Sequence, residues 1–300
     1  MSAIFRGART VVVGVLNATP DSFSDGGRFV RGLAEVDLGR AIDLAAALVR
    51  DGADVLDVGG ESTRPGAAAV PAELECDRTV PLIEQLAKRF TAPISIDTRK
   101  AQVAEAALAA GARAVNDVSG LRFDPELAGV VARARAELVV GHARGTPETM
   151  QVAPHYEAVV GEVAAELRAS LAIARAAGVG EGSLAIDPGI GFGKRPEDNH
   201  ALLVGIGALR AAVGGDLPVL VGPSRKSFLG RLTGDSPMDR DVATHAACAI
   251  AVYEGADAVR VHDVARAVRA CAVARALREA KQVSRSEPKA SEVHKAGGAS

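Results

Sequence analysis

The chain has 300 residues, of which 48% are hydrophobic and 24% are charged, with a formal net charge of −2. These values fit a single compact domain, and the near-neutral charge gives no general attraction to nucleic acid or to an anionic membrane surface. No window holds the roughly 20 apolar residues that span a bilayer, and no secretory leader pattern opens the chain. The three cysteines, Cys76, Cys248 and Cys271, lack the spacing of a metal site or redox pair, which predicts reduced thiols and a cytoplasmic location.

Eight short apolar runs predict buried parallel strands. In chain order they are residues 11–16, 53–58, 93–97, 112–116, 137–141, 184–187, 217–221 and 257–261. Between them lie segments with helical spacing, near residues 35–50, 72–89, 99–110, 125–135, 155–178, 197–213, 238–254 and 264–281. Strands that are each followed by a helix predict an α/β fold, a single-domain (β/α)₈ TIM barrel over residues 1–281, with a doubly wound open sheet as the alternative. The polar residues 282–300 predict a disordered tail.

Two loop sequences follow the first two predicted strands, at the mouth where a barrel collects its strand ends. NATPDSFSDGG, residues 17–27, begins with Asn17, whose amide oxygen suits a hard cation or a ligand, and its small polar residues predict a mobile loop. GGESTRPGA, residues 59–67, contains Arg64, whose planar fork suits a carboxylate or a phosphate. Taken alone, each stretch is equally compatible with an ordinary surface loop.

Three residues with hydrogen-bond acceptors, Asp97, Asn116 and Asp187, lie at the ends of later predicted strands. A single Asp before a turn is more often a helix cap or turn former, but three such groups around one mouth favour a ligand site. Carboxylate oxygens each accept one N–H group, and an amide both donates and accepts. The set therefore predicts a flat heterocycle with an N–C–N donor edge, such as a pterin or a guanine.

Cationic side chains follow the last two strands, in GPSRKSFLG, residues 222–230, and RVHD, residues 260–263. Arg260 lies in an otherwise apolar strand, where an ion pair with a strand-end Asp is its structural explanation. His262 lies two residues further and should face the same way. Because phosphate sites in barrels often lie after the last two strands, the pattern predicts an anion clamp. We expect acceptors on one side of the cavity and cations on the other.

Taken in order, NATPDSFSDGG, GGESTRPGA, SIDT, ND, DPGIGFGK, SRKSFLG and RVHD resemble the motifs of the dihydropteroate synthases, across most of residues 11–263. The resemblance implies condensation of 6-hydroxymethyl-7,8-dihydropterin pyrophosphate with para-aminobenzoate, which gives 7,8-dihydropteroate and pyrophosphate. It also implies Mg²⁺ as cofactor and a homodimeric barrel. The chemistry implied is a dissociative substitution, in which the C–O bond to pyrophosphate breaks before the arylamine attacks.

The resemblance also assigns roles to particular residues. The implied pterin pocket is Asp97, Asn116, Asp187 and Lys226, with Arg260 along the ring. The implied diphosphate ligands are Thr63, Arg64, Arg260 and His262, and Asn17 is the implied metal ligand. The implied aminobenzoate contacts are Pro65, Phe192 and Ser227. The residues expected to take part in catalysis are Lys226, Arg260, His262, Asp97 and Arg64.

One departure from the family pattern follows the fifth strand, where the family commonly reads Met-His-Met-x-Gly. Here Gly141 and Ala143 replace the methionines, which predicts a thinner apolar wall, and His142 is expected to be structural. A non-catalytic pterin-binding paralogue is the main alternative, although it should lose Asn17, Lys226 or the Arg260 and His262 pair first. A methyl transferase acting on a reduced folate and a phosphate-binding aldolase or isomerase barrel are further alternatives.

Overall fold

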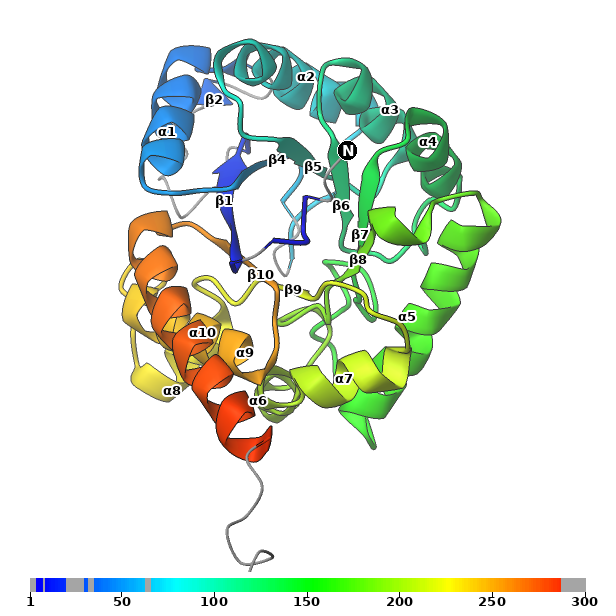
Figure 1. The fold of residues 1–300 in the computed structure, drawn as a ribbon. Coiled ribbons are helices and arrows are strands. Elements are labelled where there is room, and N and C mark those ends of the chain that lie inside the picture. The colour runs from blue at the N-terminus through cyan, green and yellow to red at the C-terminus, as the bar shows by residue number, and fades with distance from the viewer. Residues whose placement is uncertain (1–3, 8, 20–29, 32–34, 63–65, 287–300) are drawn as a thin grey trace, which may run out of the picture.

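The computed structural model describes residues 4–7, 9–19, 30–31, 35–62 and 66–286. Its central feature is a ring of eight parallel strands surrounded by helices (Figure 1). The strands are β1 (Val11–Asn17), β4 (Val55–Gly59), β5 (Ile94–Asp97), β6 (Ala114–Asp117), β7 (Glu137–Val140), β8 (Leu184–Ile186), β9 (Leu220–Val221) and β10 (Ala258–Val261). Each coincides with one of the eight predicted runs.

The ring closes, which decides between the two predicted architectures. The spatial order is β8-β7-β6-β5-β4-β1-β10-β9, so the two end strands are β8 and β9. A parallel bridge pairs Ile186 with Val219, and the Ile186 amide donates to the Pro218 carbonyl at 2.9 Å. The predicted (β/α)₈ barrel is therefore confirmed, and the doubly wound sheet is wrong.

The helices follow the predicted segments with a few differences. They are α1 (Leu38–Arg50), α2 (Ala72–Arg89), α3 (Ala101–Ala109), α4 (Glu126–Ala134), α5 (Val159–Ala176), α6 (Pro196–Val204), α7 (Ile206–Val213), α8 (Ser227–Thr233), α9 (Asp241–Glu254) and α10 (Val264–Ser286). A 3₁₀ turn covers Glu181–Ser183, and two short strands, β2 (Val30–Arg31) and β3 (Glu35–Val36), pair with each other. The predicted helix at 197–213 is interrupted at Gly205, and the short α8 was not predicted. Within the described ranges, no helix is long and apolar enough to cross a bilayer.

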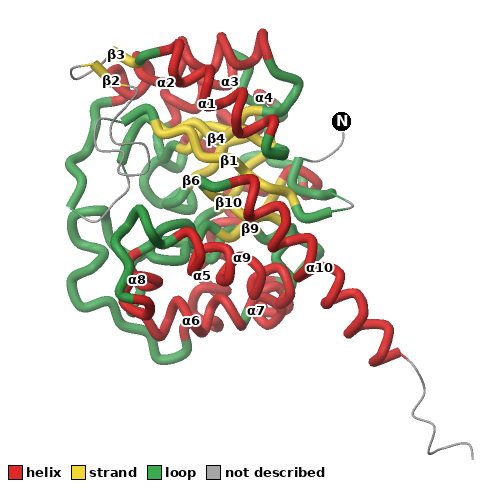
Figure 2. Tube along the Cα trace, turned by 90° about the vertical axis from the view of Figure 1, so that its left-hand side faces the viewer, coloured by secondary structure: helices red, strands yellow, loops and turns green. Residues whose placement is uncertain are grey.

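Helix α10 continues to Ser286, so residues 282–286 of the predicted disordered tail are helical. Lys281 and Gln282 are good helix formers, and nothing in residues 282–286 breaks a helix. The last turns of α10 extend beyond the barrel (Figure 2). Residues 287–300 lie outside the described part of the chain.

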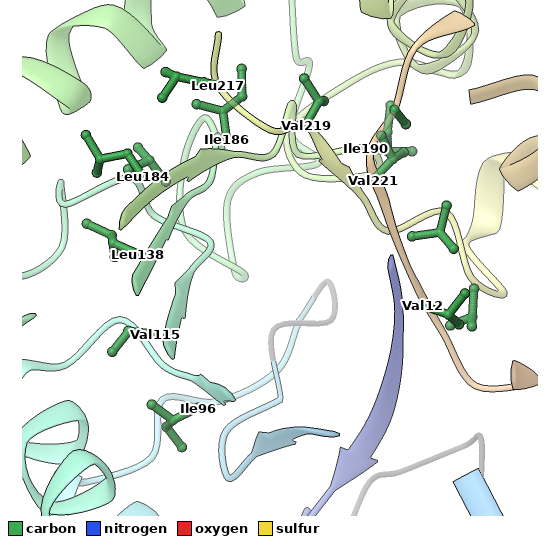
Figure 3. Packing of buried hydrophobic residues seen from close by; sticks show 14 of the residues in the cluster. Val12, Ile96, Val115, Leu138, Leu184, Ile186, Ile190, Leu217, Val219 and Val221 are labelled. Carbon is green, nitrogen blue, oxygen red and sulfur yellow. The ribbon is translucent and has the colours of Figure 1, made fainter. Parts of the chain in front are cut away.

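Alternation along the strands separates two apolar layers. Val12 points outward into the layer between strands and helices, which also holds Ile96, Leu138 and Ile186 (Figure 3). Val11 and its equivalents on the other strands point into the barrel. Because successive side chains on a strand face opposite sides, every strand except β5 contributes to both layers, and β5 contributes Ile94 and Ile96 to the outer layer only.

Phe5 closes the amino end of the barrel. Its side chain is 2% exposed and belongs to the inner layer, together with residues from the first positions of several strands. The Ile4 amide donates to the Glu137 carboxylate at 2.6 Å and holds the segment in place. The opposite, carboxyl end of the barrel carries the candidate site.

Candidate active site

Strand register brings three predicted acceptors together at the carboxyl end of the barrel. Asn17 on β1 pairs with Gly59 on β4, Gly59 pairs with Asp97 on β5, and Asp97 pairs with Asn116 on β6. A Cβ atom placed on Gly59 would lie 3.7 Å from Asn17 Oδ1 and 3.9 Å from Asp97 Oδ2. The glycine therefore lets these two oxygen-bearing side chains face the same small space.

A cavity of about 400 Å³ opens above these positions. The predicted site residues that line it are Asn17, Asp97, Asn116, Asp187, Phe192, Lys226, Ser227, Arg260 and His262. They come from strands or strand-end loops spread over the whole barrel. Thr63, Arg64 and Pro65, also predicted, lie outside the described residues, as do residues 20–29 of the first predicted loop.

Arg260 is held between two carboxylates. Its Nε donates to Asp57 Oδ2 at 2.5 Å, and its Nη2 donates to Asp97 Oδ2 at 2.7 Å. Asp57 is 1% exposed and also accepts a hydrogen bond from the Ser95 hydroxyl. The expected separation of acceptors from cations is therefore wrong, because a cation lies between two acids. Charges this deep in the protein are stabilised when each has a partner of opposite sign beside it.

Burial sets the charge state of Asp97. Loss of solvent raises the pKa of Asp97 to about 7, although the Arg260 guanidinium acts in the opposite direction and Asp57 adds to the increase. The same two carboxylates raise the pKa of Arg260 against the effect of burial, so this side chain stays cationic. Near neutral pH, Asp97 can exchange a proton while Arg260 keeps its charge.

Lys226 and Asp187 face the same cavity from the segments that follow β9 and β8. Desolvation lowers the pKa of Lys226 to about 8, although Asp187 favours its charged form, and burial raises the pKa of Asp187. The Lys226 ammonium donates to the Ile190 carbonyl and lies 4.0 Å from the centre of the Phe192 ring. Gly191, with φ +84°, allows this approach, since a Cβ there would lie 2.6 Å from Lys226 Cδ.

His262 lies on the other side of Arg260 and is oriented by Ser224. Its ring Nδ1 lies 2.9 Å from Ser224 Oγ, which also accepts from the His262 amide at 3.3 Å. The Ser224 hydroxyl can donate to Nδ1 or accept from it, and in either case it fixes the orientation of the ring. As the alternation of β10 predicts, His262 and Arg260 line the same cavity.

Some residues near the cavity were not predicted to belong to it. Asp57 could have been suspected, because it is an acid inside an apolar run. Glu61 also lines the cavity, and its carboxylate pairs with Arg99 at 3.0 Å and with Lys100 at 3.1 Å. Arg240 approaches from the segment before α9, and no local pattern predicts that contact.

The departures after the fifth strand have a physical explanation. Gly141 lines the main cavity, and a Cβ there would lie 2.6 Å from the Asp117 carbonyl, so no side chain fits without backbone movement. Ala143 lines a second cavity of about 210 Å³, which shares Met150 and Phe192 with the main one. Met150 therefore supplies a thioether to this wall from a later part of the loop.

Residues 13–262 match the model of the pterin binding enzyme family. Curated relatives include the dihydropteroate synthase of Synechocystis, which is 45% identical over 252 residues that cover 84% of each chain. This chain belongs to the pterin-binding enzyme family, among the dihydropteroate synthases. No cluster of three or more His, Cys, Asp or Glu suited to a metal occurs among the described residues of this family member.

Solved structures of the family share the fold. The dihydropteroate synthase of Yersinia pestis, solved with a sulfonamide drug complex, superposes with a TM-score of 0.84 at 38% identity and covers 91% of this chain and 95% of its own. The enzyme of Xanthomonas albilineans, solved with 4-aminobenzoic acid, has a TM-score of 0.79 at 42% identity, with 94% and 95% covered. The similarity therefore extends over nearly the whole barrel.

Proposed function

We propose that this chain is a dihydropteroate synthase, which joins 6-hydroxymethyl-7,8-dihydropterin pyrophosphate to para-aminobenzoate and releases pyrophosphate. The observation that carries the proposal is the single cavity lined by Asp97, Asn116, Asp187, Lys226 and Arg260. One basin thus offers acceptors for a heterocycle and cations for its leaving group. Relatives named dihydropteroate synthase align with this chain over most of their own length.

The pterin would lie at the deep end of the cavity. Asp97 and Asp187 would accept from its N–H groups, and the Asn116 side chain, in a residue 8% exposed, would donate and accept at the ring edge. Arg260 would lie along the ring, and Lys226 would donate to a ring acceptor. N–H groups that approach Asp97 would favour its ionised form and so lower its pKa on binding.

The diphosphate would lie towards Arg260 and His262, with Thr63 and Arg64 as further proposed ligands. Asn17 fits the role of a Mg²⁺ ligand, because its oxygen faces the same space as Asp97 Oδ2. Mg²⁺ usually takes only one or two protein oxygens when substrate phosphates complete its shell, so the single amide suffices. When bound, the ion would supply positive charge to the departing oxygens.

The arylamine would lie between the loops after β8 and β9, against Phe192 and Ser227, with Pro65 as a further proposed contact. The reaction breaks the C–O bond to pyrophosphate and forms a C–N bond, while the amine loses one proton. The buried carboxylates would stabilise the electron-poor pterin, and the cations would stabilise the diphosphate. No covalent nucleophile is required.

We also propose a homodimer and a cytoplasmic location. Helices α9 and α10 adjoin each other (Figure 1). The support for a dimer is their exposed apolar side chains, including Val242, Ile250, Val273 and Leu277. The support for a reducing compartment is the three free thiols, of which Cys248 and Cys271 are buried. Sedimentation of the wild type and of a Val242→Asp, Leu277→Asp double variant tests the dimer, which the double variant should dissociate.

The decisive experiment for the activity follows pyrophosphate release from purified protein with the pterin pyrophosphate and Mg²⁺, with and without para-aminobenzoate. Release that depends on the arylamine, together with formation of 7,8-dihydropteroate, is expected. Pterin binding without release would favour a non-catalytic paralogue, and no pterin binding would refute the proposed site.

A further inference from the structure

The loop at residues 189–193, which carries Phe192, has every one of its five carbonyl groups hydrogen-bonded by a side chain. Along the loop, the donors are Lys194 to Gly189, Lys226 to Ile190, Gln151 to Gly191, Lys194 to Phe192, and Tyr156 to Gly193. Lys194 alone supplies two of these bonds, at 2.9 Å and 3.0 Å. It is therefore the residue on which the shape of the loop depends most.

Lys194 is a buried lysine whose hydrogen-bond acceptors are all neutral groups. The residue is 3% exposed, and its ammonium also lies 2.9 Å from His142 Nδ1. Burial lowers the pKa of Lys194 well below that of a free lysine, although Asp187 acts in the opposite direction. Three acceptors lie within 3.0 Å of Nζ and the His142 carbonyl lies at 3.4 Å, so every N–H group of the ammonium form has an acceptor. Replacement by an apolar chain would leave the loop carbonyls without their donor.

A chain of hydrogen bonds holds the ammonium in place. Burial and Lys194 lower the pKa of His142 to about 4, so the ring is neutral. Because Nδ1 accepts from Lys194, Nε2 carries the proton and donates to Glu166 on α5 at 3.1 Å. Glu166 is fixed in turn by Arg144 at 2.8 Å and by Arg122 at 2.7 Å. The loop after β8 is thus tied to the loops after β6 and β7 and to α5.

We propose that Lys194 is a positioning residue that fixes the 189–193 loop, so that the Phe192 ring and the Ile190 carbonyl hold Lys226 towards the cavity. The two groups that contact Lys226 belong to the turn that Lys194 bridges. This inference deepens the proposed function, because Phe192 and Lys226 would contact the arylamine and the pterin. Lys194 itself does not line the cavity, so it acts through these neighbours.

The first test needs no substrate. The chain contains no tryptophan, so Phe192→Trp introduces a single fluorescent reporter on the loop. In that background, Lys194→Met should raise the acrylamide quenching constant at least about twofold, because the loop loses its bridge and opens locally. The matched control is Arg210→Met, which removes bonds to the Gly255 carbonyl and Asp257 near the amino ends of the strands. It should leave quenching unchanged.

The second test uses the otherwise wild-type chain. Lys194→Met should raise KM for para-aminobenzoate about tenfold to a hundredfold, since small displacements of contact groups have effects of that size. The dissociation constant of the pterin should rise as well, because the loop holds Lys226 towards the cavity, while Asp97 and Asn116 on other strands keep their positions. His142→Leu should shift KM in the same direction, and His142→Asn, which keeps an acceptor for Lys194, should restore it partly. Arg210→Met should change the melting temperature and leave KM unchanged.

The outcomes separate the two proposals. Wild-type protein without arylamine-dependent release refutes the synthase, while the quenching experiment still decides the role of Lys194. Unchanged quenching and unchanged KM in folded Lys194→Met protein would overturn the positioning role. Should Lys194→Met fail to fold, the same two measurements on His142→Leu decide the matter, because unchanged values there would equally reject it.

Discussion

Removal of Arg260 should lower the free energy of unfolding, because Arg260 pairs with two carboxylates inside the barrel. Arg260→Met leaves Asp57, 1% exposed, and Asp97 without their shared guanidinium. Breaking a buried pair by removal of one partner costs about 3–5 kcal/mol in unfolding free energy. For a domain of this size, that corresponds to a fall in melting temperature of about 6–20 °C. Turnover should be lost as well, because Arg260 lines the cavity.

The loss should depend on pH in a defined direction. Arg260 holds down the pKa of Asp97, which is about 7 in the intact site, so the variant should have a higher value. A carboxyl whose pKa is higher in the folded state than in the unfolded state binds more protons when folded, and stability then falls as pH rises. The deficit of Arg260→Met should therefore be largest above neutral pH and shrink as Asp97 becomes protonated.

Urea unfolding of wild type and variant at several pH values measures this deficit. Arg266→Met is the matched control, because its pair with Asp263 at 2.6 Å involves an arginine side chain that is 73% exposed. It should unfold like the wild type at every pH. A deficit below about 1 kcal/mol for Arg260→Met, or one that is equal at all pH values, would refute the claim that two ionised carboxylates depend on this guanidinium.

The other predictions concern ligands, pH and the barrel floor. Lys226→Ala should lower pterin affinity and turnover together, whereas Ser227→Ala should mainly raise KM for para-aminobenzoate, and equal slight effects in steady-state kinetics would contradict this site map. The pH profile of kcat/KM for the pterin pyrophosphate should rise through about 7, where Asp97 ionises, and fall through about 8, where Lys226 loses its proton, so a flat profile would argue against both roles. Phe5→Ala should lower the unfolding free energy by about 3–5 kcal/mol in urea titrations without a change in KM, because the ring fills the amino end of the barrel.

The fold could be predicted because its signals are local. Each strand is a short apolar run at a regular distance from the next, and parallel strands that alternate with helices leave few possible arrangements. The helix α8 escaped prediction because seven residues are too few to establish a helical period. Phe5 escaped because a single aromatic residue before the first strand has no periodicity to interpret.

The site was predicted as a set of residues but not as a set of contacts. Strand ends identify Asp97, Asn116 and Asp187 because a barrel sends them to one mouth. The pairing of Arg260 with Asp57 joins positions 203 residues apart, and they come together because β4 and β10 both pair with β1. Lys194 illustrates the same limit, since its motif is evident in the sequence while its partner His142 lies 52 residues earlier.

The buried Asp57 and the half-buried Asp97 and Asp187 exceed the half-buried cations Arg260 and Lys226 by one charge when all are ionised. Loss of solvent is the main cause that raises the pKa of Asp97 to about 7, and the charge of Asp57 adds to it. A ligand that brings N–H donors to the acids removes this penalty, and the relief increases as the ring becomes electron-poor during departure of the diphosphate. In the proposed reaction, the placement of Asp57, Asp97 and Asp187 around Arg260 and Lys226 would therefore favour both the bound heterocycle and the charge separation that follows.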